Sequence, residues 1–414
     1  LRPEDRTAGA VYGGPSYLPD TWRAAARVEV DGIRDRVSFG IGNTIHSGDS
    51  GLYGPEDDEW YDLARQMRYL RINSTTGARS YLRVGPVERV TLGSGALVRG
   101  YRTTAAWDER RIGVEGAIEG RRIRLAGFSD DVLGVNGVVG VEARIASGAR
   151  IGPVRSIGLT LAGVHDLGRV GIRGDSSLTG VEATLRGTVT ALGPVAVRPF
   201  ATYARYLSHG STLGGGVDVS SSNVADVLRV RGRVAAFGSS SRFEPGHVGA
   251  FYAISNDDER IVDDRTFFDE ETPELAATPL DSLSAGVDVI VDLRLLAFGR
   301  VEASQHFRRH IGDDAASAFA FRVAGRLPGG GALAFELHRE DFRGIFDLIQ
   351  DLGAVNSLLL DVRVPVGRRG MVFVRSRYGY RRLTETDGAE YADGPRRYLV
   401  ERRFEPIVGL RFGG

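Results

Sequence analysis

The chain has 414 residues, and its 53 basic and 53 acidic side chains give a formal net charge of +0 at pH 7. A neutral total argues against a nucleic-acid-binding protein, which would carry a net basic surplus. The 53 basic residues are all Arg, since the sequence contains no Lys, and the absence of Cys excludes disulfides, thiolate metal sites and Cys nucleophiles. No stretch approaches the roughly 18 apolar residues that a transmembrane helix requires.

The first 79 residues contain fewer regular patterns than the rest. No signal-peptide pattern opens the chain at Leu1, and we expect the chain to be the mature form of its protein. Residues 22–32 and 37–44 have the pattern of a hairpin, and residues 68–74 that of a further strand. Residues 93–100 are unusually rich in Gly. The first 79 residues are therefore expected either to add strands to a sheet or to fold partly into the interior of a barrel.

Period-two alternation of apolar and polar residues dominates the chain from about residue 100 onward. In Leu228–Val234 (LRVRGRV), apolar residues alternate with Arg229, Arg231 and Arg233. Successive side chains of a strand point to opposite faces, so one face of this segment is apolar and the other carries three guanidinium groups. Sixteen strands are predicted in this way, one ending near residue 102 and the others at 110–119, 121–128, 137–147, 154–165, 177–191, 194–207, 225–237, 246–255, 284–298, 300–309, 314–326, 331–340, 355–366, 370–383 and 396–412.

The links between these strands distinguish a membrane barrel from a soluble sandwich. Short links are expected at residues 120, 193–194, 299, 328–330 and 367–370, with looser ones at 148–153 and 238–245. They alternate with links that are generally longer, as in barrels with short turns at one rim and long loops at the other. We therefore predict an all-β chain, a transmembrane antiparallel up-and-down β-barrel of about 16 to 18 strands that forms a single domain over residues 1–414.

The last predicted strand provides a second indication. Phe404, Val408, Leu410 and Phe412 lie on one face of it. An aromatic-bearing terminal strand resembles the C-terminal signature of Gram-negative outer-membrane β-barrels, the porin-like superfamily. That pattern places the aromatic residue last, whereas two glycines follow Phe412 here. The resemblance implies a bacterial outer-membrane location and contact with outer-membrane lipid.

Charge is segregated along the chain. Three segments, 47–62, 256–281 and 384–395, contain 20 carboxylates and two arginines, which leaves 33 carboxylates and 51 arginines elsewhere. All three are expected at the outer rim. The acidic outer-loop candidates are Asp257, Asp258, Glu259, Asp263, Asp264, Asp269, Glu270 and Glu271. None of the segments matches the Ca²⁺-binding EF-hand pattern, so an acidic surface facing solvent or a partner is the favoured interpretation.

The remaining excess of arginine leads to a hypothesis about the barrel interior. Our lumen-lining candidates are Arg144, Arg186, Arg229, Arg231, Arg233, Arg294, Asp288, Asp292 and Glu336. Arginines on the inner face would attract anions by electrostatic focusing. Alternatively, they pair across strands with carboxylates such as Glu142, Glu182 and Glu302, which would stabilise the interior. Both roles can coexist.

Motifs for other functions are lacking. His306 and His310 resemble a helical metal pair, but a four-residue step along a strand covers about 13 Å, too far for one ion. The sequence contains no P-loop, H-E-x-x-H or G-x-S-x-G motif. We expect no enzymatic activity, metal site or cofactor. Within Phe342–Leu352, apolar residues recur at three- and four-residue steps, which predicts a short amphipathic helix.

Two functional hypotheses follow from the sequence. The first is a passive, porin-like channel for small solutes, anion-favouring if arginines line its lumen; a barrel of about sixteen strands can enclose water. The second is a structural barrel that anchors partner proteins of a surface or secretion assembly. Its contacts with other cell-surface proteins would be the acidic loops and residues 342–352.

Overall fold

A computed structural model describes residues 6–18, 21–48, 66–74, 80–104, 111–132, 137–148, 152, 154–167, 178–189, 195–207, 210–221, 228–240, 243, 246, 248–249, 252, 261–262, 284–295, 299–310, 315–327, 331–340, 356–382 and 398–413. For residues 6, 261–262, 284–285, 292, 294–295, 299–310, 315–318, 326–327, 340, 356, 381–382, 398–400 and 413, it describes the backbone alone. Among the described residues, no helix is long and apolar enough to cross a membrane.

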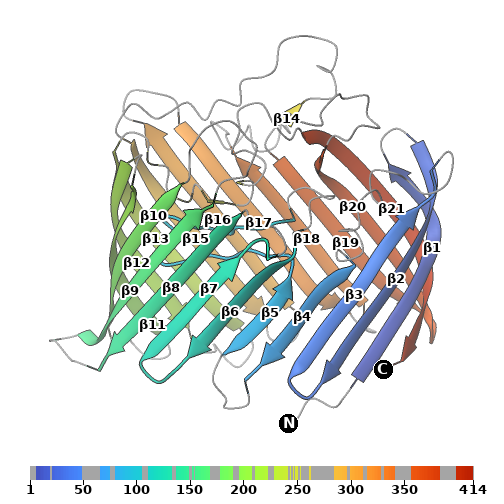
Figure 1. The fold of residues 1–414 in the computed structure, drawn as a ribbon, viewed down its shortest axis with the longest axis horizontal. Coiled ribbons are helices and arrows are strands. Elements are labelled where there is room, and N and C mark those ends of the chain that lie inside the picture. Colours follow the sequence, from blue (N-terminus) through green and yellow to red (C-terminus); the bar gives the residue numbers. More distant parts are fainter. Residues whose placement is uncertain are drawn as a thin grey trace.

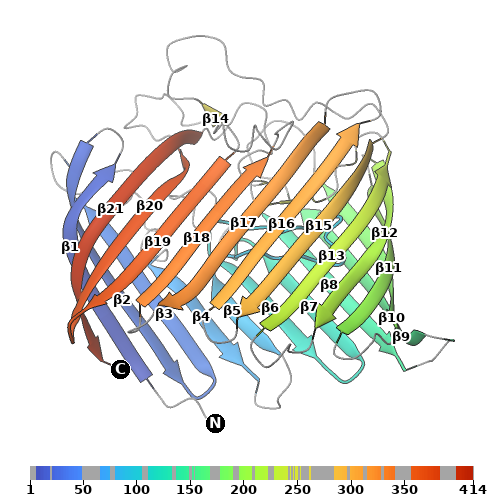
Figure 2. The same cartoon turned by 180° about the vertical axis from the view of Figure 1, so that it is seen from behind.

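Twenty of the described strands form a closed antiparallel ring (Figures 1 and 2). Each strand pairs with its neighbours in chain order, and β1 closes the ring by pairing with both β2 and β21. A short additional strand, β14 (Ile261–Val262), pairs in parallel with β21. The strands of the ring are β1 (Arg6–Leu18), β2 (Thr21–Arg34), β3 (Val37–His46), β4 (Met67–Asn73), β5 (Tyr81–Gly85), β6 (Gly113–Glu119), β7 (Ile123–Ser129), β8 (Val138–Ser147), β9 (Val154–Asp166), β10 (Thr179–Val189), β11 (Val195–Tyr206), β12 (Gly210–Ser221), β13 (Leu228–Ser239), β15 (Ser284–Leu295), β16 (Gly299–His310), β17 (Ala315–Leu327), β18 (Gly331–Glu340), β19 (Asn356–Val366), β20 (Gly370–Arg382) and β21 (Tyr398–Gly413).

The two faces of the ring are the reverse of those of a soluble sandwich. Val141, Val234 and Leu410 are 59%, 58% and 65% exposed, respectively, whereas the neighbouring Glu142 is only 4% exposed. The outer surface is thus apolar and the polar side chains are turned inward, which is the arrangement that a lipid environment selects. The prediction of an all-β transmembrane barrel is confirmed, and the soluble alternative is wrong for this chain.

The first strand, β1, begins and the last, β21, ends at the same rim, which we call the lower rim; the opposite one is the upper rim (Figure 1). Neighbouring strands at the lower rim are separated by two to seven residues, as at 35–36, 120–122 and 367–369. The longest separations, such as 240–283 and 383–397, fall at the upper rim. The predicted alternation is therefore present in part, because the upper-rim separations 19–20, 207–209 and 311–314 are as short as those at the lower rim. Strands that flank the three acidic segments all end at the upper rim, but nearly all of each segment lies outside the described residues.

The ring contains more strands than the 16 to 18 expected. The first 79 residues form four wall strands, β1 to β4, including the predicted hairpin and the strand after it. The strand β12 was not predicted, because its glycines, among them three in a row at 214–216, interrupt the alternation. Because of the additional strand β12, β13 ends at the upper rim at Ser239, so the looser short link predicted at 238–245 is wrong.

Two predicted strands do not belong to the wall. Val248, within the predicted strand 246–255, instead forms an isolated parallel bridge with Val98 inside the barrel. The strand expected to end near Arg102 is likewise an inward segment, described below. Both stretches have apolar residues that are buried inside the barrel, and alternation alone does not distinguish that environment from lipid.

The lipid-facing surface makes a testable prediction about stability. Val234 lies in the middle of β13 and faces outward, so Val234→Arg should destabilise the barrel by about 2–4 kcal/mol. Ser156→Arg on β9 is the matched control, because Ser156 lines the interior and its replacement should cost less. Denaturant unfolding of vesicle-inserted protein measures both. An equal loss for the two variants would contradict the assigned faces.

Candidate functional site

Residues 86–104, which we call the inward segment, leave the wall after β5 and cross the barrel interior. Their sequence includes TLGSGALVRG, in which Gly93, Gly95 and Gly100 have φ of 61°, 87° and 60°. These left-handed conformations favour Gly and are incompatible with a regular strand. Leu92 accepts a hydrogen bond from the backbone N–H of Gly95 (2.8 Å) and donates one to the carbonyl of Val98 (3.2 Å). The inward segment therefore turns tightly at residues 92–98.

One side of the inward segment is apolar. Leu97, Val98 and Tyr101 are at most 1% exposed, and they belong to a cluster that also contains wall residues from β7 to β11 and residues 243, 248 and 252. The Tyr101 ring lies 5.4 Å from that of Phe128, between centroids. We call this group the inner apolar cluster. Its burial anchors the inward segment to one side of the barrel, since each fully buried aliphatic or aromatic side chain contributes roughly 1.5–3 kcal/mol.

Tyr101 also has a polar anchor. Its hydroxyl donates a hydrogen bond of 2.5 Å to Oδ2 of Asp130, which accepts a second bond of 2.7 Å from Arg111 Nη1. Burial, together with the Asp130 carboxylate, raises the pKa of Tyr101 well above its ordinary value. The phenol therefore stays protonated and remains a donor at neutral pH.

Charged wall residues hold the tip of the inward segment. The backbone N–H of Gly93 donates to Glu142 Oε2 (2.7 Å), and that of Ser94 donates to Glu182 Oε1. In return, Arg186 Nη2 donates to the Gly93 carbonyl (2.9 Å) and Arg233 Nη1 to the Ser94 carbonyl (2.6 Å). Four backbone groups at the tip are thus bound by ionised side chains, which form stronger hydrogen bonds than neutral partners.

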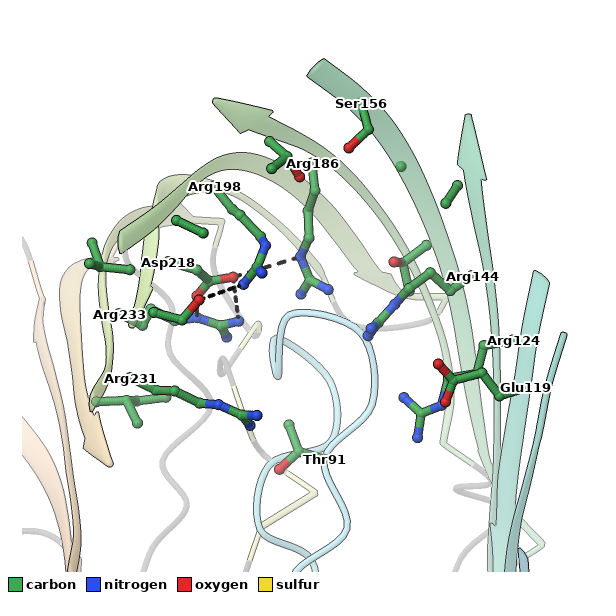
Figure 3. Close-up of a pocket in the computed structure, with 18 of the residues that line it drawn as sticks. Thr91, Glu119, Arg124, Arg144, Ser156, Arg186, Arg198, Asp218, Arg231 and Arg233 are labelled. Atoms are coloured by element: carbon green, nitrogen blue, oxygen red, sulfur yellow. Dashed lines mark hydrogen bonds and ion pairs between the residues drawn. The ribbon is translucent and has the colours of Figure 1, made fainter. Parts of the chain in front are cut away.

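Below the tip lies a cavity of about 1570 Å³ that extends toward the lower rim. We call it the arginine cavity (Figure 3). Among the described side chains, two carboxylates line it, those of Glu119 and Asp218. Hydroxyl groups such as those of Ser156, Thr188 and Ser220 also line it. Its eight arginines are Arg71, Arg124, Arg144, Arg186, Arg198, Arg229, Arg231 and Arg233.

Carboxylates compensate these arginines only in part. Asp218 accepts hydrogen bonds from Arg233 at 2.6 and 3.2 Å, and Arg186 Nε lies 3.9 Å from it. On the facing wall, Glu142 Oε1 lies 3.6 Å from Arg124 Nη1 and 3.3 Å from Arg144 Nη2. In each group a single carboxylate serves at least two guanidinium groups.

A smaller cavity of about 400 Å³, the side cavity, lies on the other side of the inward segment. Arg89 and Arg102 of the inward segment line it together with β17 to β20 and β2 to β4. Ion pairs are numerous here. Glu336 lies 2.7 Å from Arg322, Asp361 lies 2.7 Å from Arg375, and Glu29 accepts from Arg363 at 2.9 Å. Among the described side chains, eight arginines and three carboxylates line the side cavity, so it also carries excess positive charge.

The residues proposed from the sequence fall into four groups. Five lumen candidates, Arg144, Arg186, Arg229, Arg231 and Arg233, line the arginine cavity. Glu336 lines the side cavity, and Asp288 is buried in an ion pair with Arg99 of the inward segment. Asp292 and Arg294 stand opposite Arg231 and Arg229 in the β13–β15 register, where only their backbone is described. All eight acidic outer-loop candidates and residues 342–352 lie outside the described residues.

Pairing between strands accounts for part of the expected arginine role. Glu142 and Glu336 pair with wall arginines, as one of the two interpretations predicted. Glu182 instead accepts hydrogen bonds from the inward segment and from the hydroxyl of Thr184 (2.8 Å). Sequence reasoning missed Arg124 and Arg198, although both lie in alternating segments. It missed Asp218 because that residue follows the glycine run of β12.

Within the described part of the chain, no group of three or more His, Asp or Glu side chains could hold a metal ion. The candidate site therefore consists of guanidinium groups, hydroxyl groups and a few carboxylates. Such a site can attract and bind anions.

No known family model matches the sequence, and no curated protein matches it either. Similar solved structures include OccAB3 of Acinetobacter baumannii, at 12% identity and a TM-score of 0.31, with 99% of this chain and 100% of that chain covered. OpdQ of Pseudomonas aeruginosa is 8% identical with a TM-score of 0.32, covering 99% and 97%. The siderophore receptor PirA of P. aeruginosa is 10% identical with a TM-score of 0.39, covering 100% and 81%. At these values nothing of their function transfers to this chain.

The anchored tip makes a prediction with an internal control. A Cβ added at Gly93 would lie 2.2 Å from Glu182 Oε1, whereas one at Gly100 would meet no atom within 4 Å. Both residues have positive φ, so both Ala variants pay the same conformational cost of about 1–2 kcal/mol. Gly93→Ala should additionally break the Ser94–Glu182 hydrogen bond and speed exchange of the Ser94 amide about tenfold. Hydrogen exchange measures this, and equal rates in the two variants would refute the anchoring role of Glu182.

Proposed function

We propose that this protein is a passive channel of the bacterial outer membrane for small solutes, and that its lumen favours anions. The observation that carries the proposal is the arginine cavity, which eight arginines and two carboxylates line among the described side chains. Charge of one sign inside a low-dielectric wall focuses the field and raises the local concentration of counter-ions roughly 10- to 1000-fold. Anions would thus be enriched, and cations depleted, on the path through the barrel.

The inward segment shapes this path. The inner apolar cluster fills the interior beside β7 to β11, so solutes from the upper rim would pass on the other side, through the side cavity. On β4, Arg68 lines the side cavity and Arg71 lines the arginine cavity. The two cavities therefore adjoin along this strand. In this proposal the side cavity is the narrow part of the path and the arginine cavity is its wide lower end.

The alternative of an anchoring barrel draws on the acidic segments and residues 342–352, nearly all of which lie outside the described residues. The channel is the better supported of the two because the arginines on which it rests are among the described residues. A folded barrel that conducts no ions in planar bilayers, and that retains partner proteins in a native pull-down, would favour the alternative instead.

The channel hypothesis predicts the sign of ion selectivity. In a KCl gradient across a planar bilayer, the reversal potential should favour chloride. The preference should weaken as salt rises, because the Debye length shortens from about 10 Å at 0.1 M to about 3 Å at 1 M. A reversal potential on the cation side would contradict the proposal.

Charge reversal identifies which arginines govern this selectivity. The double variant Arg229→Glu and Arg231→Glu should move the reversal potential toward cations, because it removes two positive charges from the cavity and adds two negative ones. The matched control is Arg368→Glu with Arg369→Glu, an equal charge change on the exposed 367–369 turn. A shift of the same size in both double variants would show that the cavity does not determine selectivity.

A further inference from the structure

The carboxylates of the wall beside the arginine cavity are partly engaged by the inward segment. One oxygen of Glu142 accepts the Gly93 N–H at 2.7 Å, while Glu182 accepts the Ser94 N–H and the Thr184 hydroxyl. Backbone amides carry no net charge. These hydrogen bonds therefore occupy carboxylate lone pairs without neutralising the charge of any arginine. Insertion of the inward segment therefore leaves the neighbouring arginines less compensated than the wall alone would.

Three of those arginines surround a single carboxylate. Arg198 on β11 stands directly opposite Asp218 on β12, and Arg233 on β13 stands opposite Asp218 on its other side. Asp218 binds Arg233 tightly and Arg186 at 3.9 Å. Arg198 donates to the neutral Ser220 hydroxyl at 3.0 Å. Figure 3 shows the side chains of Arg186 and Arg198 both reaching into the cavity.

The inward segment also fixes the orientation of two of these groups. The Gly93 and Ser94 carbonyls accept from Arg186 at 2.9 Å and from Arg233 at 2.6 Å. Holding a side chain in its binding geometry in advance reduces the entropy that a ligand must overcome. Arg186 and Arg233 both approach Asp218, so their like charges repel each other, and an anion placed between the guanidinium groups would relieve that repulsion.

From this geometry we propose that Arg186, Arg198 and Arg233 form a saturable binding site for a small oxyanion, a carboxylate or a phosphate. This inference rests on the proposed channel function and makes it more specific. A planar guanidinium group offers paired N–H donors that match two oxygens of such an anion, which a spherical halide cannot use in the same way. The Ser220 hydroxyl, beside Arg198, adds a further polar group to this wall.

The test uses the whole protein in planar bilayers, with chloride as the conducting ion and inorganic phosphate or malonate added as the probe. Either probe should reduce the chloride current in a saturable manner, and comparison of the two shows which oxyanion the site prefers. In Arg198→Lys the positive charge remains but the paired donors are lost. The half-saturating probe concentration should therefore rise about tenfold.

The control variant is Arg369→Lys, on the exposed turn at the lower rim, which should bind the probe as the wild type does. Heat-modifiable gel mobility confirms that each variant is folded. If Arg198→Lys binds the probe as well as the wild type, or if neither probe reduces the current of an anion-selective wild type, the oxyanion site is refuted and the channel proposal stands. A wild type without anion conduction refutes both.

Discussion

Closure of the β-sheet is the constraint on which the rest of this structure depends. In the hydrocarbon core of a membrane, an unpaired backbone N–H or C=O costs several kcal/mol, so a spanning sheet can have no free edge. Here the first strand meets the last, with Ala8 opposite Gly413 and Tyr17 opposite Phe404. Once the sheet is closed, each strand has one face toward lipid and one toward the interior, and the alternation of the sequence follows from that.

A closed ring of so many strands encloses a wide interior, and that interior is lined by charged groups. Removing one partner of a buried ion pair typically costs 3–5 kcal/mol, so the charges need partners or water. Around the side cavity this need is met by ion pairs, as between Arg375 and Asp361. Beside β8 to β11 it is met differently, because the inward segment brings an apolar side to the inner apolar cluster and a polar tip to Glu142 and Glu182. The interior is consequently asymmetric, and the arginine cavity is the wider of its two arginine-rich cavities.

The sequence allowed much of the wall to be predicted, since period-two alternation is strong wherever one face meets lipid. The hairpin of β2 and β3 and most strands from β6 to β21 were located in this way. Prediction failed at β12, where consecutive glycines remove the side chains that carry the pattern. It also failed at residues 246–255 and near Arg102. Val248 and Tyr101 belong to segments that pack together inside the barrel. A sequence pattern shows that such side chains are apolar, but it does not show whether they face lipid or the barrel interior.

The amino-acid sequence by itself determined the class of fold, the alternation of short and long links, and the excess of arginine in the strands, because each of these depends on local spacing or composition. Only the tertiary structure decided which arginines share a carboxylate and which carboxylates bind the inward segment instead. Those pairings join residues as distant in the chain as Ser94 and Arg233, and they depend on how the closed sheet brings separate strands around one interior.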